Sequence, residues 1–261
     1  MDSEQPSNPS ATMLRKIFSC IDNTALSGTD THSTIEQLCL QSLRLQPQGC
    51  HVSAVCVYPV FVAQASKLLC GSGIKVATVV GGFPSGQAPL EIKLHETEYA
   101  LKNGADEIDM VISRCMVFEG NYNALRQEVS AVKQCCGTHT LKVILETGEL
   151  ASRDLIFKAS ELAMEGGADF IKTSTGKSSV SATPEAVQTM LEAIKKHCLA
   201  GGKTVGLKVA GGLTSIPEVL NYAEMTASVM GEQYIDNKTF RIGTSRLVAK
   251  IGELIMAENT E

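Results

Sequence analysis

The sequence Ala-Asp-Phe-Ile-Lys-Thr-Ser-Thr-Gly-Lys at residues 168–177 places a lysine at the end of a short apolar run, followed by a polar, glycine-containing turn. A lysine is rarely placed in a buried strand for packing, because desolvating an ammonium is costly and the group tends to lose its proton instead. An uncharged amine attacks carbonyl carbons and forms a Schiff base. We therefore predict that Lys172 is such a nucleophile.

On both sides of this stretch, short apolar segments alternate with amphipathic ones. Strands are predicted near residues 19–26, 52–58, 75–80, 106–112, 141–145, 170–173, 204–209 and 239–242. Helices are predicted over 90–103, 123–136, 153–164, 183–199 and 245–257, and others begin at Pro59 and at the capping sequences Ser33-x-x-Glu36 and Ser215-x-x-Glu218. Alternation of strand and helix indicates parallel pairing.

Eight such units in 261 residues predict an α/β protein built as a single-domain (β/α)8 TIM barrel. An open doubly wound sheet is the alternative, and it is weakened because no Gly-x-Gly-x-x-Gly motif follows the first strand. A short helix over 12–18 would extend the barrel at its N-terminus. We expect a flexible tail over 1–11, the barrel domain over 12–257 and a C-terminal tail over 258–261.

The composition excludes several classes of protein. With 44% hydrophobic and 20% charged residues, the chain can bury a full core. Its net charge of −5 comes from dispersed charges, so neither nucleic acid nor a membrane surface is an expected partner. The nine cysteines lack Cys-x-x-Cys spacing and the N-terminus lacks an apolar leader, which indicates reduced thiols in the cytoplasm. The five scattered histidines indicate no metal site.

Polar residues stand at the predicted carboxyl ends of the strands, where TIM barrels carry their active sites. These residues are Asp22, Cys56, Asp109, Glu146, Lys172 and Lys208. Strand alternation puts Lys208 on one face with the small residues Gly206 and Ala210, as suits a crowded barrel interior. A single lysine could as well extend outward or form an ordinary ion pair. Two lysines at matching strand ends favour a functional pair.

Magnitudes favour coupling between the two lysines. A lysine with a pKa of about 10.4 leaves roughly one amine in 2,500 uncharged at pH 7. Lowering that pKa by about three corresponds to roughly 4 kcal/mol, which burial and a neighbouring like charge can supply. Lys208 would be that charge, and Asp109 would hold Lys208 and transfer protons directly or through a water. A structural salt bridge is the alternative, and it applies more to Asp106 and Glu107 than to Asp109. Asp22 and Glu146 are weaker candidates.

Glycine-rich turns follow the last two predicted strands. They are Gly211-Gly212 and Gly243-Thr244-Ser245, at the standard phosphate position of this fold. Exposed backbone N–H groups at a helix start attract a dianion, and Lys177 adds a positive charge nearby. Glycines that merely end strands are the alternative, which is less common when both loops carry them.

These motifs resemble the deoxyribose-phosphate aldolases, a class I (Schiff-base, metal-independent) aldolase family on the TIM barrel. The resemblance extends from about Ile21 to Leu254. It is carried by Gly-Ala-Asp-Glu-Ile-Asp (104–109), Leu-Lys-Val-Ile-Leu-Glu-Thr-Gly-Glu-Leu (141–150), Gly-Ala-Asp-Phe-Ile-Lys-Thr-Ser-Thr-Gly-Lys (167–177), Ala-Thr-Pro-Glu (182–185) and Gly-Leu-Lys-Val-Ala-Gly-Gly (206–212).

The resemblance implies reversible cleavage of 2-deoxy-D-ribose 5-phosphate to D-glyceraldehyde 3-phosphate and acetaldehyde, without a cofactor or metal, in a homodimer. It places Lys172 on the Schiff-base lysine, Lys208 on the second lysine that tunes it, and Asp109 on the proton-relay aspartate. The implied pocket residues are Asp22, Cys56 and Thr175. The implied phosphate-binding residues are Lys177, Gly211, Gly212, Gly243, Thr244 and Ser245.

The chain departs from the family pattern at a few positions. Some members carry a C-terminal tyrosine that helps to protonate the enamine, whereas the last tyrosine here is Tyr234. Asn23 stands where histidine often occurs, and Val209 where proline or alanine is frequent. Two other functions stay open: an aldolase-fold protein with weak or lost catalysis that acts as a binding or scaffold protein, and a Schiff-base aldolase for another phosphosugar.

Overall fold

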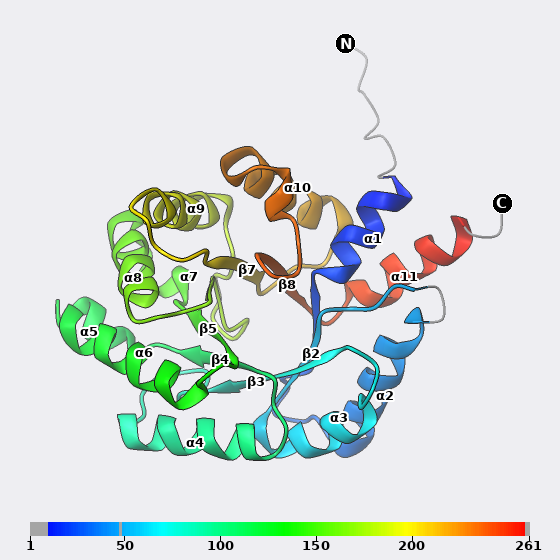
Figure 1. Cartoon of the computed structure of the whole chain (residues 1–261), viewed down its shortest axis with the longest axis horizontal. Coiled ribbons are helices and arrows are strands. Elements are labelled where there is room, and N and C mark those ends of the chain that lie inside the picture. Colours follow the sequence, from blue (N-terminus) through cyan, green and yellow to red (C-terminus); the bar gives the residue numbers. More distant parts are fainter. Residues whose placement is uncertain (1–9, 47–48, 259–261) are drawn as a thin grey trace, which may run out of the picture.

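The computed structural model describes residues 10–46 and 49–258, and the strands in that part of the chain form a closed barrel (Figure 1). Each strand pairs in parallel with the next, and β8 pairs with β1. The strands are β1 (Ile21–Thr24), β2 (Ala54–Val57), β3 (Lys75–Val80), β4 (Glu107–Val111), β5 (Thr140–Ile144), β6 (Phe170–Lys172), β7 (Gly206–Ala210) and β8 (Phe240–Thr244). The predicted (β/α)8 barrel is confirmed, and the open sheet is excluded.

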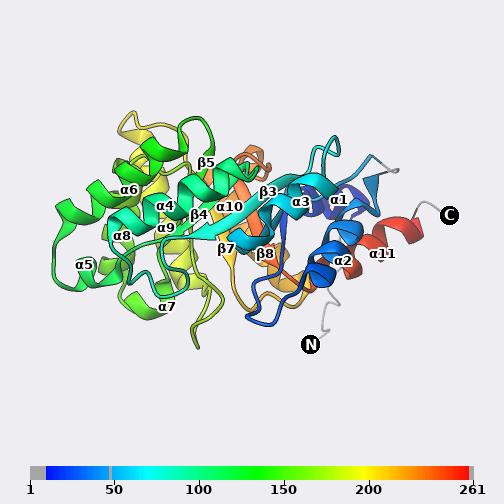
Figure 2. The same ribbon diagram turned by 90° about the horizontal axis from the view of Figure 1, so that it is seen from below.

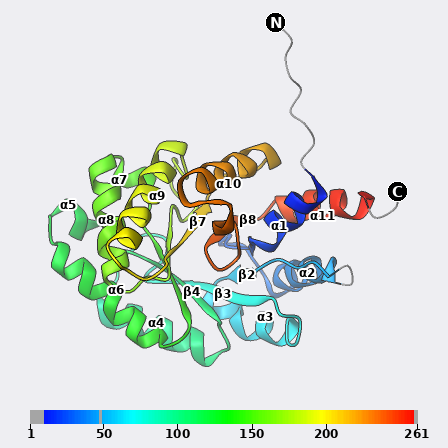
Figure 3. The ribbon, with the colours of Figure 1, turned by 45° about the horizontal axis from the view of Figure 1, so that its top comes forward.

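Helices surround the barrel in chain order, as Figures 1 and 3 show. They are α1 (Ala11–Ser19), α2 (His32–Leu43), α3 (Val62–Leu68), α4 (Leu90–Lys102), α5 (Arg114–Phe118), α6 (Tyr122–Cys136), α7 (Thr147–Leu150), α8 (Arg153–Glu165), α9 (Pro184–Leu199), α10 (Ile216–Met230) and α11 (Leu247–Glu258), with the 3-10 turns η2 (Pro59–Phe61) and η3 (Glu232–Tyr234). The first helix, α1, packs against the last, α11.

The view from below shows α3 and α4 following one another along the near side of the barrel (Figure 2). Bulky aliphatic residues on the outward faces of the strands pack against the helices that surround the barrel. Leu207 and Val209 of β7 do so and are fully buried, as strand alternation predicts. None of the helices in the described residues has the length and apolar character that crossing a membrane requires.

Most predicted boundaries agree with the structure within one or two residues, but the first capping box is wrong. Helix α2 begins at His32, because Thr31 is its cap: the Thr31 hydroxyl accepts from the Thr34 N–H at 3.2 Å, and the Thr34 hydroxyl accepts from the Thr31 N–H at 3.2 Å. Ser33 therefore already lies inside the helix. At α10 the expected cap, Ser215, accepts from the Glu218 N–H at 3.3 Å.

The ends of the chain and two short helices also differ from expectation. Most of the predicted tail over 1–11 lies outside the described residues, but Ala11 already begins α1. Residues 259–261 also lie outside them, and Glu258 ends α11. No sequence pattern indicated α5 and α7, which have five and four residues. Such short helices carry too few residues for an apolar period to show.

The barrel interior has an apolar side and a charged side. Strands β2 and β3 fill it with small apolar residues, which are Ala54, Cys56, Ala77 and Val79. On the neighbouring strands β6 and β7, the ring of Phe170 takes the space beside Gly206, where a Cβ would lie 2.2 Å from the ring. Charged side chains from β1, β4, β5, β6, β7 and β8 fill the remaining space. The charged residues are therefore held on rigid strands.

Candidate active site

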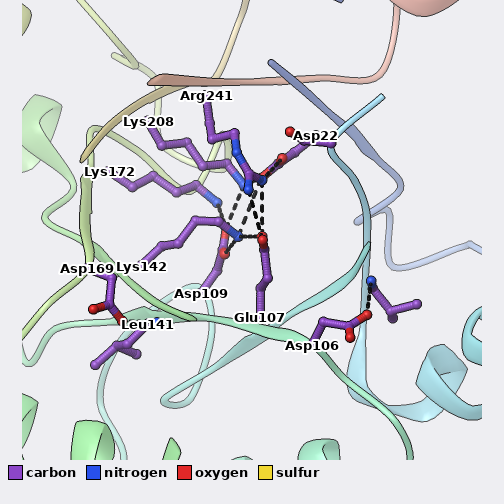
Figure 4. A network of polar contacts seen from close by, with 12 residues as sticks. Asp22, Asp106, Glu107, Asp109, Leu141, Lys142, Asp169, Lys172, Lys208 and Arg241 are labelled. Atoms are coloured by element: carbon purple, nitrogen blue, oxygen red, sulfur yellow. Dashed lines mark hydrogen bonds and ion pairs between the residues drawn. The ribbon is translucent and has the colours of Figure 1, made fainter. Parts of the chain in front are cut away.

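Seven charged side chains meet inside the barrel and form one network of ion pairs (Figure 4). The strand register brings them together: Lys172 lies beside Lys208, Lys208 beside Arg241, and Asp109 beside Lys142. Because these neighbours project to the same side of the sheet, their side chains converge. The seven residues are Asp22, Glu107, Asp109, Lys142, Lys172, Lys208 and Arg241.

Asp109 accepts hydrogen bonds from all three lysines of this network. Its Oδ2 accepts from Lys172 Nζ at 2.8 Å and from Lys208 Nζ at 2.7 Å, so the two lysines share one oxygen. Its Oδ1 accepts from Lys142 Nζ at 2.7 Å. Asp109, Lys142 and Lys208 are fully buried, and Lys172 is 3% exposed. The structure thus brings together the three residues that the sequence singled out for chemistry.

Glu107, Asp22 and Arg241 form the rest of the network. Glu107 Oε2 lies 2.6 Å from Lys142 Nζ, and Glu107 Oε1 accepts from Arg241 at 2.9 Å. Asp22 accepts from Arg241 at 2.7 Å through Oδ1, and its Oδ2 pairs with Lys208. A structural salt bridge was the alternative that applied more to Asp106 and Glu107 than to Asp109, but Asp106 and Glu107 differ in the structure. Asp106 lies apart from the network and accepts from the Val76 N–H (Figure 4).

Charge is unbalanced in this network: among the described residues it joins four cations to three carboxylates. Burial disfavours every charged form. For Lys142, Lys208 and Arg241 the adjoining carboxylates outweigh burial and raise the pKa. For Lys172, burial and then the charge of Lys208 outweigh the attraction of Asp109, so its pKa is lowered. Lys172 is therefore the network cation whose positive charge the carboxylates stabilise least.

A cavity of about 600 Å³ opens above the network, at the carboxyl ends of the strands. Of the four cations in the network, Lys172 is the one that lines it. Thr175 also lines it, and so does every residue predicted to bind phosphate. These are Lys177, Gly211, Gly212, Gly243, Thr244 and Ser245. The cavity wall thus combines the buried amine of Lys172 with glycine-containing turns and two exposed cations, Lys177 and Arg246.

Two of the rim turns lie against each other, and each has a glycine at the point of approach. Gly176 and Gly211 have φ angles of 76° and 93°, in the left-handed region. A Cβ on Gly211 would lie 2.5 Å from Ser181 Oγ and 3.3 Å from the Gly176 Cα. Arg246 lines the same rim and was not predicted as a site residue. Its position, directly after the predicted phosphate turn, was the available signal.

The three predicted pocket residues lie in different places. Asp22 belongs to the ion-pair network and does not line the cavity. Cys56 is buried on the apolar side of the barrel, where burial raises the pKa of its thiol. Thr175 lines the cavity, but its hydroxyl and N–H both donate to Glu146. Glu146, with a left-handed φ of 57°, thereby joins the β5 and β6 loops.

Tyr234, the last tyrosine, does not reach the cavity. It is buried below α10, and its hydroxyl donates to the Val205 carbonyl. Within the ion-pair network, Lys142 and Arg241 are the residues that were not predicted from the sequence. The signal was present: Lys142 stands in the β5 segment between Leu141 and Val143, on the alternate position from these aliphatic residues.

Comparison with known proteins agrees with this geometry. The model of the DeoC/LacD family aldolases matches residues 16–235. The chain belongs to this aldolase family. A bovine and a human protein, each named deoxyribose-phosphate aldolase, are both 41% identical to this aldolase over 254 residues, which cover 92% of it and 80% of each relative.

Solved structures resemble the aldolase over nearly its whole length. A crystal structure of a candidate deoxyribose-phosphate aldolase from Toxoplasma gondii is 28% identical with a TM-score of 0.87, and the match covers 95% of both chains. The deoxyribose phosphate aldolase from Aeropyrum pernix, described as a tetramer, is 28% identical with a TM-score of 0.72 and covers 94% of this chain and 93% of its own. The fold and the family match therefore agree.

Proposed function

We propose that this aldolase reversibly cleaves 2-deoxy-D-ribose 5-phosphate to D-glyceraldehyde 3-phosphate and acetaldehyde, and that Lys172 forms the Schiff base. The names of the bovine and human relatives support the substrate. One observation carries the role of Lys172: it is the network cation that lines the cavity, and it is the one whose pKa is lowered. A buried amine that has a lowered pKa and faces a cavity is placed to attack a carbonyl.

The first step is attack of the neutral Lys172 amine on the C1 aldehyde carbon of the open-chain sugar. A carbon–nitrogen bond forms, water leaves, and a protonated imine results. This imine withdraws electrons from C2 and weakens the C2–C3 bond. Lys208 and Lys142 keep their charges and hold Asp109 ionised beside the new imine, since the pKa of Asp109 is held well below its usual range.

The second step breaks the C2–C3 bond. Asp109, acting through a water, takes the proton of the C3 hydroxyl, and the C2–C3 electron pair moves into the imine to give an enamine. Glyceraldehyde 3-phosphate leaves as the aldehyde. The enamine is then protonated at C2, and hydrolysis of the imine releases acetaldehyde and restores Lys172. Among the network residues, Lys172 bonds to the substrate and Asp109 acts on it through the water.

The cavity rim supplies the recognition of the phosphate in this proposal. The turns at Gly211-Gly212 and Gly243-Thr244-Ser245 line the cavity, and Lys177 adds an exposed positive charge. Backbone N–H groups of such turns would donate hydrogen bonds to the phosphate oxygens. Phosphate held at the rim would leave the aldehyde end of a five-carbon sugar free to extend toward Lys172. Binding energy from the phosphate then positions the reacting carbon.

Borohydride trapping tests the proposal. The protein is incubated with deoxyribose 5-phosphate or acetaldehyde, reduced with borohydride, and analysed by peptide mass mapping. We expect a stable adduct on Lys172 and its loss in Lys172→Ala, while Lys177→Met, which removes another cavity-lining lysine, keeps the adduct. Adducts spread over exposed lysines, with none on Lys172, would reject the assignment.

The same material separates the other functions. An adduct on Lys172 without cleavage of any phosphosugar would favour a binding or scaffold protein. Cleavage of another phosphosugar faster than deoxyribose 5-phosphate would favour a Schiff-base aldolase for that sugar. The homodimer and the cytoplasmic location stay predictions, as do the domain boundaries; the mass in solution, measured by light scattering, tests the dimer.

A further inference from the structure

Two members of the charge network lie at the end of the barrel that faces away from the reaction cavity. Glu107 and Arg241 do not line that cavity, but they do line a second one of about 460 Å³. Its wall includes Lys75, Thr140 and Phe170, which are the first residues of β3, β5 and β6. This second cavity is therefore at the amino ends of the strands. Neither Glu107 nor Arg241 can touch a substrate bound at the carboxyl ends.

Both residues are nevertheless built into the network with good geometry. Arg241 donates to the two oxygens of Glu107 at 2.9 and 3.1 Å and to Asp22 Oδ1 at 2.7 Å. Its guanidinium also lies 5.5 Å from the centre of the Phe170 ring. Glu107 in turn lies 2.6 Å from Lys142, which contacts Asp109. Figure 4 shows this continuous chain of contacts from Arg241 to Lys172.

We propose that Glu107 and Arg241 are positioning residues that set the charge on Lys172 from the far end of the barrel. The inference rests on the proposed role of Lys172 as the Schiff-base amine. Arg241 keeps its charge at every pH that a protein experiences, so it balances one of the three carboxylates. Two carboxylate charges then remain for three lysines. Lys172 has the fewest partners, since its one carboxylate oxygen is shared with Lys208.

The charge count gives opposite predictions for the two residues. Without the Arg241 charge, three carboxylates balance three lysines, and Lys172 keeps its proton to higher pH. Without the Glu107 charge, the surplus of positive charge grows, and Lys172 loses its proton at lower pH. The other groups that face the network are Asp22 on β1, the thiol of Cys56 on β2, Asp109 on β4, Lys142 on β5 and Lys208 on β7, while β3 contributes Ala77 and Val79.

The experiment compares the full chain with Arg241→Gln, Glu107→Gln, the double variant and Arg241→Lys. The rate of ethylation of Lys172 by acetaldehyde and cyanoborohydride is followed by peptide mass spectrometry from pH 5 to 9, which reports the amine without using the sugar substrate. We expect the acid side of the profile to move up by roughly half to one pH unit in Arg241→Gln and down by a similar amount in Glu107→Gln. The double variant and Arg241→Lys should both stay near the parent profile.

Opposite shifts cannot come from structural damage, which would lower the rate in both variants at all pH values. Circular dichroism and the unfolding midpoint check that each variant folds, and each folded single variant carries its own signed prediction. If the ethylation rate of Lys172 has the same pH profile in the single variants as in the parent, or if both profiles shift in the same direction, the inference is overturned. The proposed function would still stand, because Lys172 would still form the adduct. No adduct on Lys172 of the parent at any pH would overturn the proposed function, and this inference with it.

Discussion

The substitution Lys142→Met removes the ammonium of a network residue that was not predicted from the sequence. Methionine keeps most of the volume of the lysine side chain. Lys142 is fully buried, and its Nζ lies 2.7 Å from Asp109 and 2.6 Å from Glu107. A hydrogen bond to a charged group contributes about 1.5–3 kcal/mol, so two of them amount to about 3–6 kcal/mol. Part of this loss is offset, because the variant no longer desolvates an ammonium. We expect a net loss of about 2–4 kcal/mol in the free energy of unfolding.

Equilibrium urea unfolding at pH 7 measures this loss, and Lys203→Met is the matched control. Lys203 makes the same kind of contact, 2.7 Å from Asp169, but its side chain is 44% exposed. An exposed pair contributes at most about 1 kcal/mol, so the control should lose far less stability than Lys142→Met. The comparison isolates burial, because both variants replace a lysine that contacts an aspartate.

The loss should also depend on pH with a definite sign. Cations hold the pKa of Asp109 and Glu107 below their usual range in the folded protein, so their contribution to stability is full above about pH 5 and is lost as pH falls. The gap between parent and Lys142→Met should therefore narrow below about pH 4. A Lys142→Met variant as stable as Lys203→Met, or a gap that is constant down to pH 3, would refute the reasoning.

Three further predictions concern other parts of the chain. Lys208→Leu removes the like charge beside Lys172, so Lys172 keeps its proton and turnover at pH 7 falls by about 10- to 100-fold, with recovery toward higher pH; an unchanged pH–rate profile would count against this role. Lys177→Met and Arg246→Ser should each raise KM for the phosphosugar by about tenfold, and should not affect cleavage of unphosphorylated deoxyribose, since both residues lie on the cavity rim. Lys93→Met should lower the free energy of unfolding by about 3 kcal/mol and leave the pH–rate profile unmoved, because Lys93 pairs at 2.8 Å with the buried Glu128 outside the active site; a shifted profile would show that this pair acts on the chemistry.

Much of this structure could be predicted from the sequence because TIM barrels obey local rules. The strand β3 and the helix α9 were predicted to within a residue, since alternation, apolar period, Thr183 as cap and Pro184 at the helix start all agree there. Lys172, Lys208 and Asp109 were predicted because each is a charged residue near the end of an apolar strand. The contacts among them confirm that the three meet.

Strand alternation could have placed the Lys142 side chain inside the barrel, but the contacts that this residue and Arg241 make depend on the three-dimensional structure. Lys142 and Arg241 lie deeper in the barrel than Lys172, and depth is set by the shear of the closed sheet rather than by any local pattern. Asp106 and Glu107 are adjacent in the sequence, yet one side chain faces solvent and the other faces the barrel axis. Cys56 was predicted to line the substrate pocket, but its side chain is buried in the barrel among small apolar residues.

The order of the charges along the chain has a consequence for how the barrel assembles. All three carboxylates of the network come from β1 and β4, in the first half of the chain, and all four cations come from β5 to β8, in the second half. Each half-barrel on its own would carry an interior of one sign, repelling itself. The two halves are therefore electrostatic complements, and a chain divided in the loop between α6 and β5 should reassociate from its pieces in preference to pairing either piece with itself.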